Sequence, residues 1–308
     1  MANPSRSAAW ARLAGLARGR RQAGSAQASR WLRSRSAKAA AAGLALFGLV
    51  AILGPLIFPY DSVGTRVADR LLPPGSTRSD GSLALLGTDQ LGRDVLAQVV
   101  AGARISLLVA LTVVLVGGIV GLVLGLLAGY YGGWLDAVIS RIGDMQLAFP
   151  SILLAILLAG ALGPSLLNVI IALAVTRWVI FARVARGSAL SARGREHVDS
   201  ARAMGASGLR IMARYIYPAC VQPLLVAATV QVGLTMVAEA ALSFLGLGVP
   251  VNQASWGSTI ASGRDHLASA WWIAAIPGVA LTLVVICVGV LGDTARDRSD
   301  PKTQEAAK

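Results

Sequence analysis

Two ionisable side chains, Arg177 and Glu239, lie inside long apolar stretches of the chain. A charged group within a membrane is costly, so each is a candidate for function. Arg177 could extend its side chain to the cytoplasmic surface, or it could line a pathway and meet a substrate carboxylate. Glu239 could attract a substrate amine, or it could hydrogen-bond the segment 249–257. For both residues we favour the structural alternative.

The residue patterns of common enzyme sites are missing from the sequence. Its two histidines, His197 and His266, lie in separate polar segments, and there is no HExxH pattern, lysine-bearing phosphate loop or Cys/His cluster. An intramembrane hydrolase would need a nucleophile beside a base, and none is visible. Cys220 and Cys287 lie in apolar stretches and are interpreted as small buried hydrophobes. We therefore expect a non-catalytic protein without a metal or cofactor of its own.

The elements that carry these residues are predicted to be transmembrane helices. The 308-residue chain has a mean hydropathy of +0.65 and only 14% charged residues, against about 25% in a typical soluble domain. Several apolar runs reach the roughly 20 residues that span a bilayer, and Gly163-Pro164-Ser165 divides one of them as a turn would. We predict an all-α polytopic membrane protein with about six spans: 39–58, 105–128, 138–162, 165–186, 216–242 and 270–292.

The charge distribution predicts the topology. The first 38 residues hold nine Lys/Arg and no acid, and residues 177–214 hold eight Arg against Glu196 and Asp199, whereas 59–104 is balanced. Because Lys/Arg excess is typical of cytoplasmic loops, we place both termini and 187–214 in the cytoplasm, with 59–104 and 249–269 outside. The location of the +13 net charge argues against nucleic acid and favours contact of the basic tail with anionic lipid. An organellar transit peptide has a similar composition and stays open as an alternative for the tail.

The predicted organisation follows from these boundaries. It comprises a basic cytoplasmic tail (1–38), a first helix with an extracytoplasmic loop (39–104), a core (105–295) and a cytoplasmic C-terminal tail (296–308). The second helix carries glycines at strict four-residue spacing, which places them on one face. Small residues in this pattern let transmembrane helices approach closely, so we expect a packing face there. Its members are Gly117, Gly121, Gly125 and Gly129.

The polar loop 195–218, REHVDSARAMGASGLRIMARYIYP, carries Ala201, then Gly205 four residues on, then Pro218 thirteen residues later. This spacing resembles the cytoplasmic E-A-A-x3-G-x9-I-x-L-P loop of bacterial ABC importer permeases. Asp199-Ser200-Ala201 occupies the E-A-A positions and Tyr215-Ile216-Tyr217-Pro218 the I-x-L-P positions. The glycine-to-proline spacing is intact, while the first two positions, the isoleucine and the leucine are altered.

Further motifs extend the resemblance over roughly residues 40–301, in the order expected for dipeptide, oligopeptide and nickel permeases. Together they resemble the second, C-type, chain of the two permeases in such an importer. The segments concerned are LGTDQLGRDVL (86–96), GARISL (102–107), GYYGGWLD (129–136), EAALSFLGLGVP (239–250), SWG (255–257) and the acidic and basic residues of 292–301.

The resemblance implies a type I ABC importer permease fold in the bacterial inner membrane. It implies half of a pore, paired with a second homologous permease, two cytoplasmic ATPases that bind ATP and Mg, and an extracytoplasmic binding protein. It also implies a coupling helix at about 196–212 that docks on the ATPase. The candidate contacts within it are Glu196, Asp199, Ala201, Arg202, Gly205, Ala206, Ser207 and Arg210.

Short peptides are the predicted substrate. A nickel route would be expected to show a line of His, Cys or carboxylate ligands in the helices, and only Glu239 and the edge residue Asp144 are available. A peptide of variable side chain needs a wide passage with few fixed ligands, which suits mostly apolar helices. A permease for nickel or another small solute is the alternative. A membrane scaffold without transport is a lesser alternative, since it leaves the loop spacing unexplained.

Overall fold

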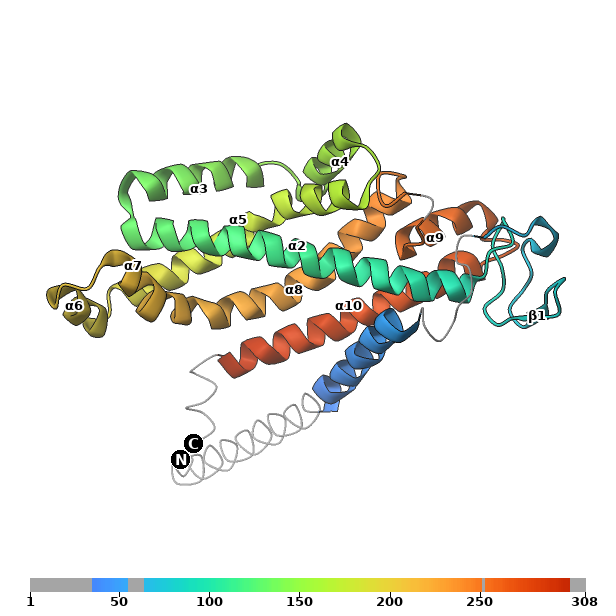
Figure 1. The fold of residues 1–308 in the computed structure, drawn as a ribbon, viewed down its shortest axis with the longest axis horizontal. Coiled ribbons are helices and arrows are strands. Elements are labelled where there is room, and N and C mark those ends of the chain that lie inside the picture. The colour runs from blue at the N-terminus through green and yellow to red at the C-terminus, as the bar shows by residue number, and fades with distance from the viewer. Residues whose placement is uncertain (1–34, 55–63, 251–252, 300–308) are drawn as a thin grey trace, which may run out of the picture.

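The computed structural model describes residues 35–54, 64–250 and 253–299, and apart from one short hairpin their regular structure is helical (Figure 1). Most of the predicted tails, 1–38 and 296–308, lies outside these residues. Five helices are long and apolar enough to cross a membrane, or six if one bent pair counts as a single span, which agrees with the prediction of about six. The helices are Arg35–Gly54, α2 (Val95–Tyr131), α3 (Gly133–Leu147), α4 (Ser151–Leu162), α5 (Leu166–Arg193), α6 (Glu196–Ala203), α7 (Gly208–Ile211), α8 (Tyr217–Phe244), α9 (Trp256–Gly263) and α10 (Trp272–Ser299).

The predicted third span, 138–162, is not one straight helix. It is a pair, α3 and α4, bent by 87° (Figure 1). Pro150 lies between the two helices. Proline has no main-chain N–H to donate to a helical hydrogen bond, and it disfavours the α conformation of the residue before it. The apolar run continues across this break, so the composition alone does not reveal it.

Helix α2 begins ten residues before its predicted start at 105. Asp94 caps it, since its carboxylate accepts hydrogen bonds from the main-chain nitrogens of Leu96 at 2.7 Å and Ala97 at 3.3 Å. Arg104 interrupts the apolar run and displaced the predicted boundary. The added turns are nevertheless buried, with Val95 packing against Trp272 and Ala103 against Trp256.

The polar segment 64–94 folds onto the first residues of α2 and α10. It contains the 3-10 turn η1 (Val67–Asp69) and the antiparallel strands β1 (Ser76–Thr77) and β2 (Leu83–Ala84), with Ser76 opposite Ala84. The buried Asp89 carboxylate accepts hydrogen bonds from the Arg93 Nε at 2.7 Å and the Gln98 Nε2 at 2.9 Å. The Trp272 indole donates to the Thr88 carbonyl oxygen at 3.1 Å. Residues 64–94 of the predicted loop therefore form a small ordered cap.

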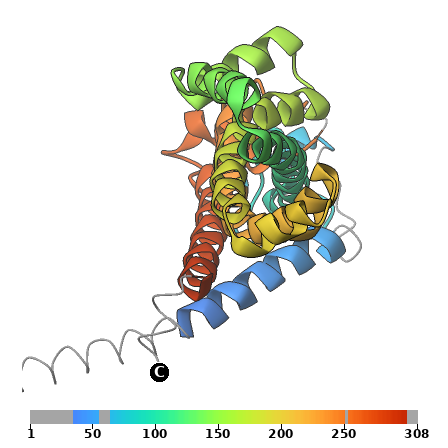
Figure 2. The ribbon, with the colours of Figure 1, turned by 90° about the vertical axis from the view of Figure 1, so that its left-hand side faces the viewer.

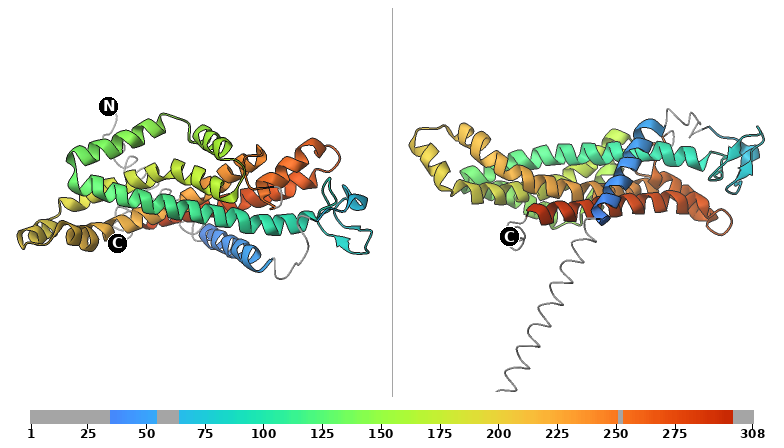
Figure 3. Two further views of the ribbon diagram at one scale, coloured as in Figure 1. Left: turned by 45° about the horizontal axis from the view of Figure 1, so that its top comes forward. Right: turned by 90° about the horizontal axis from the view of Figure 1, so that it is seen from below.

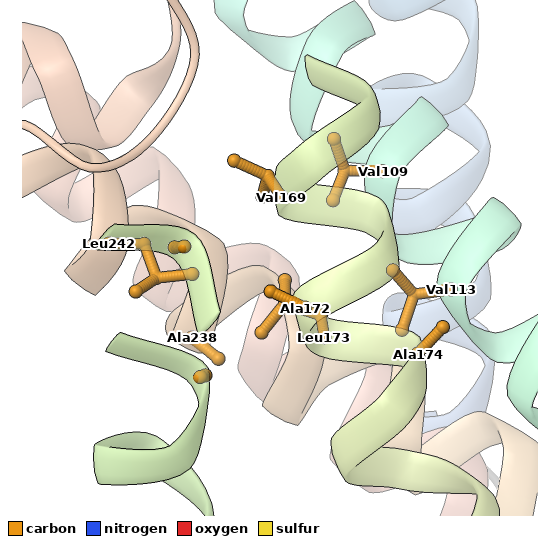
Figure 4. Packing of buried hydrophobic residues seen from close by; sticks show 10 residues of the cluster. Val109, Val113, Val169, Ala172, Leu173, Ala174, Ala238 and Leu242 are labelled. Atoms are coloured by element: carbon orange, nitrogen blue, oxygen red, sulfur yellow. The ribbon is translucent and has the colours of Figure 1, made fainter. Parts of the chain in front are cut away.

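The core lies where α2, α5 and α8 meet. Figure 4 shows Val109 and Val113 of α2 facing Val169, Leu173 and their neighbours on α5, with Leu242 of α8 alongside. The Arg35–Gly54 helix lies outside this bundle, beside α10 (Figure 2). Phe47 of that helix packs with Val284 and Val288 of α10, so it is attached through one face only.

The bundle presents its two polar regions at opposite ends. The cap 64–94 occupies one end, and the loop 194–216 between α5 and α8 occupies the other (Figures 1 and 3). The cap 64–94 and the loop 194–216 are therefore separated by the full length of the membrane-spanning helices.

Candidate functional site

The loop between α5 and α8 consists of two short helices joined by a glycine turn. Helix α6 covers Glu196–Ala203, helix α7 covers Gly208–Ile211, and a π-helical turn η2 (Met212–Ile216) leads without interruption into α8. The segment predicted as a coupling helix, 196–212, is thus divided near its middle. A continuous helical path therefore joins α7 to α8, which is part of a candidate membrane span.

Gly205 makes the turn between the two helices. Its φ is +80°, and the main-chain nitrogen of Ala206 donates to the Ala201 oxygen at 3.1 Å, which is the six-to-one bond of a Schellman motif. Nothing lies within 4 Å of the position that a Cβ would take. The glycine is therefore required in this chain by its backbone conformation and not by close packing.

The inner side of the loop is held against the ends of the long helices. Val198 and Ala201 of α6 are buried together with Ile211 and Ile216, and Ala206 packs against the same cluster. A Cβ at Gly208 would lie 3.2 Å from the ring of Tyr130 at the end of α2. These contacts fix the orientation of the loop relative to α2 and α5.

The outer side of the loop is exposed and carries most of the predicted contact residues. Asp199 and Arg202 form an ion pair of 3.2 Å in which both side chains are exposed. Glu196 lies in the first turn of α6, and Ser207 and Arg210 at the start and end of α7 are also exposed. Ala201 is the one member of the predicted set whose side chain is buried.

Two exposed apolar side chains complete this outer surface and were missed from the sequence. Met204 is 80% exposed and Leu209 is 73% exposed, on either side of the Gly205 turn. Two large apolar side chains exposed at the tip of a polar loop make this tip a candidate surface for contact with another protein. The sequence could have indicated them, since they are the large apolar residues on either side of Gly205 in an otherwise polar segment.

The glycine stripe of α2 lies against α5. A Cβ would stand 2.5 Å from the Phe181 Cβ at Gly121, 2.4 Å from the Ala182 oxygen at Gly125 and 2.7 Å from the Ala189 Cβ at Gly129. At Gly117 the nearest atoms are 3.5 Å away, an ordinary contact distance. The closest approach of the two helices therefore lies in the half of α2 and α5 nearer the loop 194–216.

Charged pairs join α3 to α5 in the same half of the molecule. Arg186 donates to both carboxylate oxygens of Asp136, from Nε at 2.5 Å and from Nη2 at 2.6 Å. Arg183 donates to Asp144 at 2.7 Å. Both acidic residues of α3 are thus paired with arginines of the neighbouring helix α5.

Glu239 is fully buried in the last two turns of α8. Its carboxyl group accepts hydrogen bonds from the Ser106 hydroxyl of α2 at 3.0 Å and from the Ser243 hydroxyl at 2.7 Å. The Ser106 bond ties α2 to α8, while the Ser243 bond lies within α8. Neither serine belongs to the segment 249–257 that was predicted to receive the carboxyl group.

Arg177 lies in the middle of α5 and is half-buried. Its Nη2 donates to the main-chain oxygen of Leu234 on α8 at 3.3 Å. Because α5 continues to Arg193, seven residues past the predicted end, more of the helix lies between Arg177 and the loop 194–216 than the sequence suggested. The guanidinium contacts α8 through this bond.

Comparison with known proteins gives the following relatives. A family model described as "Binding-protein-dependent transport system inner membrane component" matches residues 121–305, and one described as "N-terminal TM domain of oligopeptide transport permease C" matches residues 27–74. A di/tripeptide transport system permease protein of Pseudomonas aeruginosa is 39% identical over 281 residues, covering 90% of this chain and 92% of the relative.

A further relative and a solved structure agree with these matches. A dipeptide transport system permease protein of Escherichia coli is 40% identical over 279 residues, covering 89% of this chain and 93% of the relative. A solved structure, described as an amino acid ABC transporter with histidines, superposes with a TM-score of 0.51 at 16% identity, covering 65% of this chain and 94% of that chain. The last comparison shows a shared fold alone.

Proposed function

This chain belongs to the binding-protein-dependent transport system inner membrane components, and from that membership we propose that it forms half of a pore through which short peptides are imported. As an ABC importer permease it is a non-catalytic subunit, and ATP is bound by partner ATPases. The observation that carries the peptide assignment is the set of relatives named as peptide permeases, which are about 40% identical over about 90% of the chain.

The loop 194–216 is the proposed contact with the ATPase. Its outer surface combines the exposed Met204 and Leu209 with the charged side chains of Asp199 and Arg202. An apolar contact surrounded by charged groups resembles the centre and rim of protein interfaces in general. The buried inner side and the continuous path into α8 let a movement of the ATPase displace the membrane helices.

The partners and topology follow from this assignment. A binding-protein-dependent importer has a binding protein and ATPases. The finer proposal is a second homologous permease, two ATPase subunits at the loop 194–216 and a binding protein at the end that carries the cap 64–94. The basic sequence of the loop, with both termini cytoplasmic, is consistent with the Lys/Arg excess of inner loops.

The transport cycle then follows alternating access. Closure of the ATPases on ATP would move both coupling loops and open the pore outward, and the binding protein would release its peptide. Hydrolysis would restore the inward-facing state.

The substrate assignment is tested with the complete importer in proteoliposomes that contain ATP. Labelled di- to pentapeptides are offered in parallel with nickel complexes, and a complex lacking this chain is the control. The proposal requires ATP-dependent uptake of peptide only when the chain is present. Uptake of nickel without uptake of peptide would refute the peptide assignment and leave the permease assignment intact.

A further inference from the structure

Arg177 places a positive charge near the middle of the membrane. It lies 11 residues from the outer end of α5, which at 1.5 Å per residue is about 16 Å. Its hydrogen-bond partner Leu234 lies a similar distance, about 15 Å, from the outer end of α8. Since the hydrocarbon core is about 30 Å thick, the guanidinium lies close to the midplane.

The guanidinium is incompletely paired. Its hydrogen bond to the Leu234 oxygen engages Nη2, while Nε is buried and has no hydrogen-bond partner in the described part of the chain. No ion pair among residues 35–54, 64–250 and 253–297 includes Arg177. Arginine carries five donors and keeps its charge in proteins, so a carboxylate is the partner that this side chain is suited to hold.

The same layer of the structure holds other polar atoms without partners. Gln231 Oε1 and Thr235 Oγ1 are buried on α8 within one turn of Leu234, and neither has a hydrogen bond among the described residues. Unpaired buried polar atoms are rare in proteins and call for an explanation. Both lie on α8, the helix that Arg177 contacts, so several polar atoms without hydrogen bonds are found at one depth of the membrane.

This layer opens onto an exposed face of α5 and α8. Leu234 is 46% exposed, and Val175 and Val230 nearby in sequence are each 42% exposed. A half-buried guanidinium at the midplane would be costly against lipid. The face beside Arg177 is therefore better suited to a pathway between two permeases than to contact with the lipid tails.

We infer that Arg177 binds the carboxylate of a peptide as it passes the middle of the membrane. The inference rests on the proposed peptide substrate. The planar guanidinium can donate two parallel hydrogen bonds to a carboxylate, one from Nη1 and one from the second N–H of Nη2, while the first N–H of Nη2 keeps its bond to the Leu234 oxygen. The pathway would thus favour peptides with a free carboxyl group over neutral analogues, in addition to any selection by the binding protein.

The test compares two peptides that differ in one group. A labelled tripeptide with a free C-terminus and its C-terminal amide are offered to the complete importer in proteoliposomes. The affinity of the binding protein for each is measured separately, and each peptide is supplied at a concentration that saturates the binding protein. The variants are Arg177→Gln and Arg177→Lys. Arg183→Gln is the matched control, an arginine on the same helix that pairs with Asp144.

Arg177→Gln is expected to slow uptake of the free-acid peptide by about tenfold or more, while uptake of the amide changes by less than about twofold. Arg177→Lys keeps the charge but not the planar fork and should fall between wild type and glutamine. Arg183→Gln should affect both peptides alike. If Arg177→Gln fails to assemble, the two peptides are compared with Arg177→Lys, for which a loss confined to the free acid is still expected.

Equal losses for both peptides, or no loss, would show that Arg177 serves only to hold α8 and would overturn the inference. Absence of peptide uptake by the wild-type importer would instead contradict the proposed function. The two failures are therefore distinguishable in the same experiment.

Discussion

A Cβ atom added to Gly125 of α2 would stand 2.4 Å from the main-chain oxygen of Ala182 on α5. Real Cβ contacts are never so close, so the two backbones approach as they do only because the side chain is missing. The glycines of α2 therefore pack against one neighbour, α5, and set the distance between the two helices in the half nearer the loop 194–216.

Gly125→Ala is expected to lower the free energy of unfolding by about 1–3 kcal/mol, because the added methyl group forces the helices apart. Gly118→Ala in the same helix is the control, since its Cβ would meet the Phe181 ring at an ordinary 3.9 Å. Thermal unfolding of the two purified variants in detergent measures the difference. Equal melting temperatures would contradict the close approach.

The effect of a substitution at Gly205 should depend on how well the new residue tolerates a positive φ. Because φ is +80°, alanine is expected to cost about 1–2 kcal/mol in the turn, and asparagine less, since it tolerates this conformation better. Stimulation of the partner ATPase by substrate-loaded binding protein should therefore decrease in the order Gly, Asn, Ala. Gly194→Ala is the control, because Gly194 has a φ of −87° and open space around its Cβ position. An alanine variant as active as wild type would mean that the turn does not need its left-handed conformation.

Asp136→Asn should loosen α3 from α5. The two hydrogen bonds from Arg186, at 2.5 and 2.6 Å, are charge-assisted, and their loss is expected to cost about 1–3 kcal/mol. Asp144→Asn provides a comparison, because the Asp144–Arg183 pair is exposed and should contribute less than about 1 kcal/mol. The melting temperatures of the two purified variants are compared. A larger loss of stability for Asp144→Asn than for Asp136→Asn would contradict the view that the Asp136–Arg186 pair is the stronger one.

Single cysteines test the topology in a background that lacks Cys220 and Cys287. Thr77, Ser200 and Ser269 are all exposed, the first two lying at opposite ends of the bundle. An impermeant thiol reagent applied to intact cells should label cysteines at 77 and 269 and leave position 200 unlabelled, and inverted vesicles should give the opposite pattern. Labelling of position 200 in intact cells would invert the proposed orientation.

Much of this architecture could be predicted from the sequence because it depends on local patterns. Hydropathy predicted the membrane helices, and the four-residue repeat of glycines predicted one packing face of α2. The bend at Pro150 was missed because the apolar run hides it, and the early start of α2 was missed because Asp94 and Arg104 interrupt the same kind of run. In each case the deciding contact is a cap or a break that hydropathy does not measure.

The functional surfaces were only partly predictable. The loop motif identified Gly205, but whether that glycine serves packing or conformation depends on its φ, which the sequence does not contain. Met204 and Leu209 occupy positions that the motif leaves unspecified, and their exposure is known only once the loop is folded. The surroundings of Arg177 likewise depend on α8, a helix more than fifty residues away in the chain.

Recruitment of the ATPase by the loop 194–216 tests the central claim most directly. The ATPase that copurifies with the tagged wild-type chain is quantified, and the same measurement is made for a Met204→Asp, Leu209→Asp double variant and for Leu85→Asp, an exposed leucine at the opposite end of the bundle. We predict that the double variant loses most of the bound ATPase while Leu85→Asp retains it. Equal recovery of ATPase with the double variant and the wild type would contradict the proposal that this loop couples the chain to ATP hydrolysis.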